Sequence, residues 1–404
     1  MLAGMILANL GGSMFYPFFA ILLKQLGFEV DSIGLYFTLA SIFPLLFQVI
    51  GGWVSDRIGR LRSIAFGSAA GALSWVGILL APSMTLPIVW FLASDALGAM
   101  TRSLVGPSFD AFVADQSGEE SRGRVFAVVH TIFMVVGIAG PPLGGVIVER
   151  FGFPALIRAG AGLYWSATVL RVIMARRAAS LPAATAAAGS HGTGRPGLAA
   201  SLRDIVGLAA AGGVFLWIMI VDGALDIAGR LSQDLLPLYL KEIGRLTESR
   251  IGLLQGLSAV CMAATMLPMG TLADRRGERF PVMIGCFAIP GSVALFVFGR
   301  GIVAYAFAYA IFGASGGCFG PPMQSLITKV VPQRLRGLAF GFLSTSLGVF
   351  SFFAPAVGGL LWKRFFPTLP FLVSGVICGL AAIPVYLKYR VPPSTAAPAA
   401  AGPA

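Results

Sequence analysis

The chain has 404 residues, of which 57% are hydrophobic and 11% are charged, and its mean hydropathy is +0.85. A soluble domain of this length cannot bury so much apolar surface, so the composition indicates an integral protein of the lipid bilayer. The formal net charge of +12 would favour a nucleic-acid partner in a soluble chain, but here most basic residues lie in short segments between apolar runs, where they set membrane topology. We therefore expect no nucleic-acid partner.

The sequence shows no pattern of a metal, redox or nucleotide site. The four cysteines all fall within apolar runs and lack the C-x-x-C spacing of metal and redox sites. The dipeptide Gly-Lys is missing, so the chain has no Walker A loop for ATP phosphates. We expect no metal and no cofactor, and we expect that the protein is not an enzyme.

Twelve apolar runs are long enough to cross a membrane. A bilayer core about 30 Å thick requires roughly 20 helical residues per crossing. The predicted fold is an all-α membrane protein with twelve transmembrane helices. These helices are expected at 2–23, 33–52, 63–82, 86–108, 125–148, 154–175, 206–239, 251–269, 281–299, 301–323, 338–361 and 369–388.

The basic residues are distributed unevenly between the predicted loops. With both termini on one side, that side holds 17 Lys and Arg residues, the opposite side holds 8, and 4 lie within predicted helices. Because basic loops are retained in the cytoplasm, we expect both termini to be cytoplasmic in a multi-pass protein of the cell inner (plasma) membrane.

A short charged turn follows the second predicted helix and recurs after the eighth. Glycine, aspartate, arginine and glycine return at the same spacing 218 positions later. The first copy contains Gly52, Asp56, Arg57, Gly59 and Arg60, and the second contains Gly270, Asp274, Arg275 and Gly277. Further matches occur at an offset of 214, such as Gly106-Pro107 with Gly320-Pro321. The chain therefore consists of two copies of a six-helix unit, a repeat typical of secondary transporters.

Two six-helix halves and the repeated pattern G-x-x-x-D-R-x-G together resemble the major facilitator superfamily, over essentially the whole chain. The resemblance implies two pseudo-symmetric six-helix bundles. It also implies that the motif holds the cytoplasmic side of the first half against helix 11 in one state. The first copy departs from the family pattern at Leu61, where a second basic residue is usual, although Arg62 follows. The second copy has Glu278 where arginine is usual.

Predicted helix 4 carries Asp95 and Arg102, which lie seven residues apart and therefore on one face. An ionisable side chain at the bilayer centre costs roughly 2.5–3.5 kcal/mol on insertion scales, so such residues usually face a cavity or a partner. Arg102 is similar to the helix 4 basic residue that antiporters of this superfamily use in proton handling, but Val105 stands where glutamine is usual. We expect both residues to take part in proton coupling.

Predicted helix 5 contains a G-P-x-x-G-G element formed by Gly140, Pro141, Gly144 and Gly145. It resembles an element of the drug:proton antiporters of the same superfamily. Physically, the proline kinks the helix and the glycines let a neighbouring helix pack closely. Generic close packing is the alternative interpretation, and the similar pattern from Pro355 to Gly359 in the second half favours it.

Two segments have a low-complexity composition. Ala, Gly, Ser, Thr and Pro dominate from Ala178 to Ala200 and again after Pro392. This composition predicts a flexible tether and a disordered tail. The expected organisation is a first bundle over 1–175, a cytoplasmic linker over 176–203, a second bundle over 204–391 and a tail over 392–404.

Predicted helix 7 carries Asp222, Asp226 and Arg230 at positions i, i+4 and i+8 of one face. These residues are candidates for proton coupling, and Asp222 is the stronger proton carrier because it has no partner on its own helix. The alternative is a structural pair of Asp226 and Arg230. The helix is longer than one crossing requires, so it must tilt, break or protrude.

In the superfamily, helices 1, 4, 7 and 10 line a central cavity. The resemblance therefore places a substrate cavity at Asn9, Phe15, Tyr16, Tyr305, Tyr309 and Phe312. An aromatic wall with a few acids suits amphipathic or cationic lipophilic compounds, through stacking and cation–π contact.

These observations predict a proton-coupled secondary transporter, expected to be a monomer, that exports lipophilic or cationic small molecules by alternating access. Its expected partners are the small-molecule substrate, protons and the bilayer. Two alternatives stay open. The first is an importer or facilitator of a small metabolite such as a sugar or organic acid, in which Arg102 binds an anionic group. The second is a transport-inactive membrane receptor or scaffold.

Overall fold

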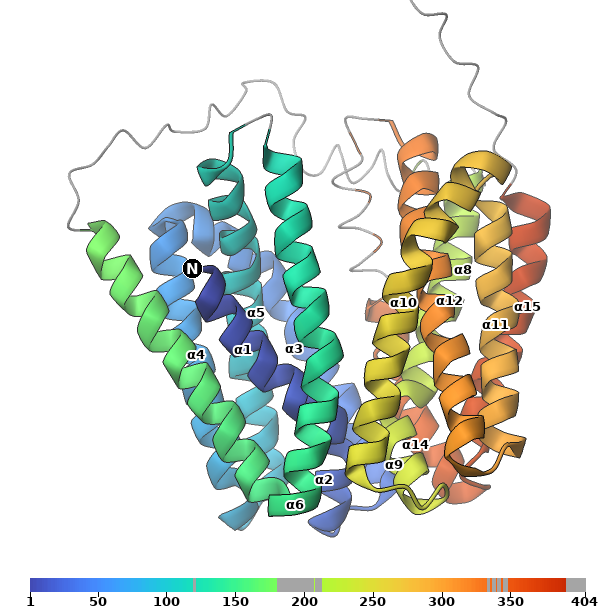
Figure 1. Cartoon of the computed structure of the whole chain (residues 1–404), viewed down its shortest axis with the longest axis horizontal. Coiled ribbons are helices and arrows are strands. Elements are labelled where there is room, and N and C mark those ends of the chain that lie inside the picture. Colours follow the sequence, from blue (N-terminus) through green and yellow to red (C-terminus); the bar gives the residue numbers. More distant parts are fainter. Residues whose placement is uncertain are drawn as a thin grey trace, which may run out of the picture.

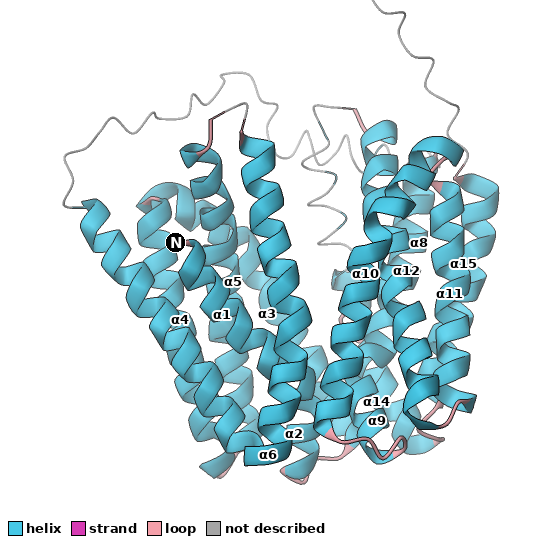
Figure 2. Ribbon diagram, viewed as in Figure 1, coloured by secondary structure: helices cyan, strands magenta, loops and turns pink. Residues whose placement is uncertain are grey.

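The computed structural model describes residues 1–118, 121–179, 207, 213–332, 335, 339, 343 and 348–389. Almost all of these residues are helical, and short loops join the helices (Figure 2). The helices form two bundles that lie side by side (Figure 1). The prediction of an all-α protein built from two bundles is therefore confirmed.

The first bundle contains the elements up to the end of α6. Its bounds are α1 Leu2–Phe15, η1 Tyr16–Phe18, α2 Phe19–Gln25, α3 Val30–Ile58, α4 Arg60–Leu80, η2 Ala81–Ser83, α5 Pro87–Gln116 and α6 Arg122–Ala179. Helix α6 holds two of the predicted crossings, because the chain reverses at Gly152, where φ is 78° and ψ is 173°. Only glycine adopts such a positive φ without a steric penalty. The last residues of α6 are helical from 176 to 179, where the sequence predicted the start of the linker.

The second bundle begins with α8. Its bounds are α8 Val214–Ser232, η3 Gln233–Leu235, α9 Leu236–Glu242, α10 Glu248–Arg276, α11 Arg279–Phe298, α12 Gly301–Val330, α14 Ala354–Arg364 and α15 Leu369–Lys388. The predicted helix at 338–361 is described only in part, with α14 at its end. The rest of the predicted linker and the predicted tail lie outside the described residues.

Within the described residues, nine helices are long and apolar enough to cross a membrane, with α6 counted once. The second arm of α6 and the interrupted α8–α9 segment supply two more of the predicted crossings, and α14 belongs to the predicted crossing at 338–361, which is described only in part. Helix 7 breaks at η3, which is one of the three outcomes that its length predicted. The corresponding break in helix 1 is η1, and each break has a proline, Pro17 or Pro237, at or just after it. Proline lacks the N–H that a continuing helix would use.

The repeated charged turn is shorter than the sequence predicted. Helix α3 continues to Ile58 and α10 continues to Arg276, so most of each motif is helical. The expectation that these helices end near positions 52 and 269 was wrong, because nothing in the motif breaks a helix before its last glycine. Gly59 and Gly277 make the reversal, each with φ of 87°. The side chains of residues 48–58 lie outside the description.

The two bundles meet at one end, which we call the closed end. There α6 packs on α10 and α3 packs on α14. In Figure 1 the ribbons meet at the bottom and diverge toward the top. The largest cluster of buried apolar side chains includes residues of both bundles, whereas two smaller clusters each belong to one bundle. We call the opposite end, which carries Gly59 and Gly277, the motif end.

Candidate functional site

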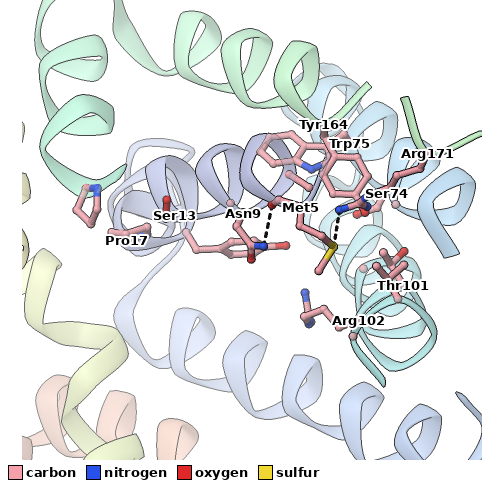
Figure 3. Close-up of a pocket in the computed structure, with 18 residues that line it drawn as sticks. Met5, Asn9, Ser13, Pro17, Ser74, Trp75, Thr101, Arg102, Tyr164 and Arg171 are labelled. Carbon is pink, nitrogen blue, oxygen red and sulfur yellow. Dashed lines mark hydrogen bonds between the residues drawn. The ribbon is translucent and has the colours of Figure 1, made fainter. Parts of the chain in front are cut away.

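A cavity of about 790 Å³ lies within the first bundle, between α1, α4, α5 and α6. Figure 3 shows its lining, with Asn9 from α1 and Arg102 from α5 among the labelled residues. Tyr16 from η1 also lines it. These three residues belong to the set that the sequence selected. The cavity falls within the size range of small-molecule sites.

Asp95 and Arg102 are connected through a tyrosine. Asp95 is only 9% exposed, and the Tyr36 hydroxyl donates a hydrogen bond to its carboxylate. Tyr16 lies between the two charged residues and interacts with both. Arg102 itself is exposed, and it borders the cavity. The structure thus brings together the two helix 4 residues that the sequence placed on one face. It adds Tyr36, which sequence reasoning missed.

Arg171 also lines the cavity, and it was missed by the sequence analysis. Its side chain is 2% exposed and has no carboxylate partner among the described residues. One guanidinium nitrogen donates to the Ser68 hydroxyl at 3.0 Å, and another donates to the Gly4 carbonyl at 2.9 Å. The Nε atom has no hydrogen-bond partner among the described residues. The available signal was an arginine well inside the apolar run at 154–175, whose other arginine, Arg158, lies near its start.

The charged residues of α8 are arranged as a pair and a single acid. Arg230 Nε donates to Asp226 Oδ2 at 3.0 Å, and the Ser351 hydroxyl donates to the same oxygen. This is the structural pair that the sequence left open as an alternative. Asp222, one turn away, has no ion pair or hydrogen bond with the described residues and is partly buried.

The position of Asp222 along the membrane normal follows from the packing of α8 on α15. The Ser374 hydroxyl donates to the Ala228 carbonyl at 2.7 Å, so these two residues lie opposite each other. With a rise of 1.5 Å per residue, Asp222 is about 16 Å from the Leu369 end of α15. This depth is close to the middle of a core about 30 Å thick.

The six predicted cavity residues divide into three groups. Asn9 and Tyr16 line the cavity of the first bundle. Tyr309 and Phe312 line a smaller cavity of about 280 Å³ between the bundles, which Tyr16 and Asp234 also border. Phe15 and Tyr305 line neither of these two cavities. Phe15 is fully buried against Trp75, and Tyr305 stacks on Phe296 in the core.

The helix 5 element lies at the contact between bundles. Gly140 and Gly144 pack against α1, whereas Pro141 and Gly145 contact α10. Within the described part of the chain, no group of His, Cys, Asp and Glu side chains could hold a metal ion. The described residues thus include a cavity lined by two guanidinium groups and, on α8, two acids, of which Asp226 is paired with Arg230.

The model of the Major Facilitator Superfamily matches the chain twice, at residues 1–244 and 235–404. The chain belongs to the Major Facilitator Superfamily. It is a multi-pass membrane transporter and not an enzyme.

Relatives of this superfamily member include antiporters and efflux pumps. A Na(+), Li(+), K(+)/H(+) antiporter of Planococcus maritimus is 25% identical over 88% of this chain and 87% of the relative. A PmrA homologue of Lactococcus lactis, a multi-drug resistance efflux pump, is 23% identical over 86% of this chain and 84% of the relative. A bacterial homologue of the iron transporter ferroportin, in an inward-facing state, superposes with a TM-score of 0.76 at 17% identity. That superposition covers 96% of this chain and 97% of the other, and it supports the fold alone.

Proposed function

We propose that this transporter is a proton-coupled antiporter that exports lipophilic small molecules by alternating access. The observation that carries the proposal is Asp222, a carboxylate near mid-membrane depth without an ion-pair partner among the described residues. An unpaired carboxylate in an apolar environment is costly, and protonation removes that cost. Asp222 can therefore exchange a proton as its access to water changes.

The neighbouring acid, Asp226, is held in a fixed position and acts electrostatically on Asp222. Asp226 is held by Arg230 and Ser351, so its charge is compensated within the second bundle. Its negative charge, one helical turn away, acts on Asp222. In this arrangement Asp222 carries the proton and the Asp226–Arg230 pair positions it.

The substrate class rests on the walls of the larger cavity. Trp75, Tyr164 and Val105 supply apolar and aromatic surface beside a few polar groups. This combination suits lipophilic compounds. The names of the relatives from Planococcus maritimus and Lactococcus lactis, an antiporter and an efflux pump, agree with proton-coupled export. Cationic substrates, which the sequence also suggested, would have to use the acids of α8, because the described lining of this cavity has no carboxylate.

Alternating access requires a second state in which the closed end opens. The structure has the bundles joined at the end predicted to be extracellular and diverging toward the motif end (Figure 1). Rocking the bundles would open the first end and close the second. The proposed cycle therefore loads substrate from the cytoplasm and releases it outside while a proton enters.

The test is transport in proteoliposomes with an imposed pH gradient. Three probes cover the charge classes: N-phenyl-1-naphthylamine, ethidium and 2-naphthoate. Asp222→Asn and Asp226→Asn should abolish gradient-driven movement of the transported probe. The first variant loses the proton carrier, and the second loses the acid that positions it. Exchange of labelled for unlabelled probe without a gradient should persist, which shows that the variants are folded.

Asp110→Asn is the matched control. Asp110 is an exposed carboxylate on α5 to which we assign no role in coupling. Its removal should leave gradient-driven transport unchanged. If Asp222→Asn and Asp226→Asn both transport at the wild-type rate under the pH gradient, the proposed coupling is refuted.

A second candidate function is import or facilitated transport of a small organic acid. The two guanidinium groups that line the larger cavity, Arg102 and Arg171, favour it. Counterflow of the anionic probe that does not change with pH in the wild-type protein would support this alternative over antiport.

A further inference from the structure

The charges that line the larger cavity have one sign. Arg102 and Arg171 are its only ionisable lining residues apart from the tyrosines Tyr16 and Tyr164, and no carboxylate lines it in the described structure. A membrane protein usually pairs such charges within its own fold. Here neither guanidinium has an ion pair among the described residues, so the cavity is positively charged.

Arg102 supplies a guanidinium that a ligand can reach. Its side chain is exposed, and it turns back along α5 toward Gly98. A methyl group on Gly98 would lie 3.4 Å from Arg102 Nη1, 3.5 Å from Ser74 Oγ and 3.8 Å from Tyr16 Oη. Three hydrogen-bonding groups from three helices thus surround one point on the cavity wall.

Arg171 adds charge that the fold holds in place. Its side chain is almost completely buried, and its hydrogen bonds to Ser68 and Gly4 fix it between α4 and α1. These partners are neutral, so they orient the guanidinium without compensating its charge. Among the described residues, the Nε–H has no acceptor and no carboxylate compensates the positive charge of this guanidinium. An anion in the cavity would compensate that charge.

The remaining wall is apolar. Trp75 and Tyr164 pack against each other with ring centroids 6.4 Å apart, and Met5 and Val105 complete this side. A volume of about 790 Å³ leaves room for an aromatic ring system in addition to a carboxylate.

We propose that this cavity binds amphipathic organic anions, with the anionic group held by Arg102, Ser74 and Tyr16 and the apolar part against Trp75. Arg171 strengthens the site through its fixed positive charge. The inference deepens the proposed function, on which its transport role rests, by naming the charge class of the substrate.

Asp95, which interacts with the lining residues Tyr16 and Arg102, gives the proposal a second test. It lies behind Tyr16, outside the lining, and acts electrostatically on Arg102. Its negative charge opposes an anion in the cavity and would favour a cation. Removal of that charge must therefore change the affinities of anions and cations in opposite directions.

The experiment measures equilibrium binding to the purified full-length protein by titration calorimetry, without a gradient. The probes are 2-naphthoate and 2-naphthylmethylammonium, which share a ring system and differ in charge. We expect the carboxylate to bind the wild-type protein at least tenfold more tightly. Arg102→Gln should weaken naphthoate binding about 10- to 100-fold, because a charge-assisted hydrogen bond is lost. Arg102→Lys should weaken it less, because the charge is kept.

Arg171→Gln should weaken naphthoate binding severalfold. Because Arg171 is buried, this variant can also fail to fold, and Asp95→Asn supplies a test that does not depend on it. Asp95→Asn should tighten naphthoate binding and weaken binding of the ammonium probe. Arg158→Gln is the control, since Arg158 lies on α6 outside the cavity and, within the described structure, its side chain bonds to the Pro154 carbonyl of its own helix alone.

Preferential binding of the ammonium probe would overturn the proposal, as would weaker naphthoate binding in Asp95→Asn or unchanged binding in Arg102→Gln. Binding without a gradient does not depend on proton coupling. If coupling through Asp222 fails, these affinities are unaffected. If the cavity does not prefer anions, the transport test of Asp222 still stands.

Discussion

Two of the contacts that hold the closed end are copies of each other. We call them the α6–α10 seam and the α3–α14 seam. A methyl group on Gly252 would lie closer than 3.0 Å to the Pro141 carbonyl, and one on Gly34 would lie equally close to the Pro355 carbonyl. Gly34 and Gly252 are 218 positions apart, and the two prolines are 214 apart. The offsets found in the sequence thus describe individual contacts between helices.

The repetition changes the interpretation of the helix 5 element. Gly145 approaches the Glu248 carbonyl in one seam, and Gly359 approaches the Val30 carbonyl in the other. Close packing explains both patterns, which is the alternative that the sequence left open. The G-P-x-x-G-G pattern by itself is therefore weaker support for export than Asp222.

The two seams differ in their polar contacts. In the α3–α14 seam the Ala356 N–H donates to Thr38 Oγ1 at 2.9 Å, and Lys363 pairs with Asp31 and Glu29. At the equivalent positions of the α6–α10 seam, Pro142 packs against Gly256. Glu149 there accepts a hydrogen bond from the Ser249 N–H at 3.0 Å. Among the residues that the structure describes, both seams share the close backbone approach, and an ion pair is present only in the α3–α14 seam.

The motif end shows the same relation with the charges exchanged. Arg60 pairs with Asp115 at 3.0 Å in the first bundle, and Glu278 pairs with Lys329 in the second. These pairs occupy equivalent positions at the offsets of 218 and 214. The unusual Glu278 in the second motif is therefore matched by a lysine where the first bundle has an acid. The exposures also differ, since Glu278 is buried and both members of the first pair are exposed.

The largest effect is expected from the glycines shared by both seams. Gly34→Ala and Gly252→Ala should each abolish transport, because the added methyl group meets a backbone carbonyl that cannot move aside. Electron spin resonance distances between labels at the exposed Gln25 and Ile243, at the ends of α2 and α9, should lengthen in both variants. Gly162→Ala is the control, since nothing lies within 4 Å of that position. If the spin-label distance across the closed end is unchanged in either variant, the two seams are not equivalent.

The next largest effect distinguishes the two ion pairs at the motif end by their contributions to stability. Lys329→Gln should lower the free energy of unfolding by about 1–3 kcal/mol, because the buried Glu278 carboxylate loses its cation. Arg60→Gln should lower it by less than about 1 kcal/mol, because its pair is exposed. Thermal unfolding in detergent measures both. Equal losses would show that the difference in exposure has no energetic consequence.

The pH dependence of the second pair follows from Glu278. Burial raises the pKa of this carboxyl, but hydrogen bonds from Lys329 and Ser325 outweigh burial and hold it below its ordinary value. The resulting stabilisation is present above the ordinary carboxyl pKa and is lost as the pH falls through the lower, folded-state value. Wild-type protein should therefore lose stability in acid more steeply than Glu278→Gln. Parallel unfolding curves between pH 6 and pH 3 would refute this.

The smallest effect concerns the ion pairs of the α3–α14 seam. Lys363→Gln should shift the balance only slightly toward an open end, since exposed pairs contribute little. High salt should reproduce the shift in the wild-type protein. Glu149→Gln keeps an oxygen that can accept from Ser249, so it should leave the distances and their salt dependence unchanged. The same spin-label distances report both variants.

Local spacing predicted much of this structure. The apolar runs predicted the helices, and the repeat offsets of 218 and 214 predicted the two bundles. The i, i+4 spacing predicted the Asp226–Arg230 pair. Contacts between distant helices could not be predicted. The Tyr36–Asp95 bond joins residues 59 positions apart, and the Arg171–Gly4 bond joins residues 167 apart. Both depend on how each helix is rotated in its bundle, which one sequence does not specify.

The buried cluster at the closed end has a thermodynamic consequence for the transport cycle. Helices α2 and α9, of seven residues each, place side chains such as Leu22 and Leu240 in this cluster, which draws on both bundles. Opening this end would hydrate that apolar surface and so carry a positive heat-capacity change. The free-energy difference between the closed and open states should therefore be a curved function of temperature. Cooling would weaken the hydrophobic stabilisation of the closed end.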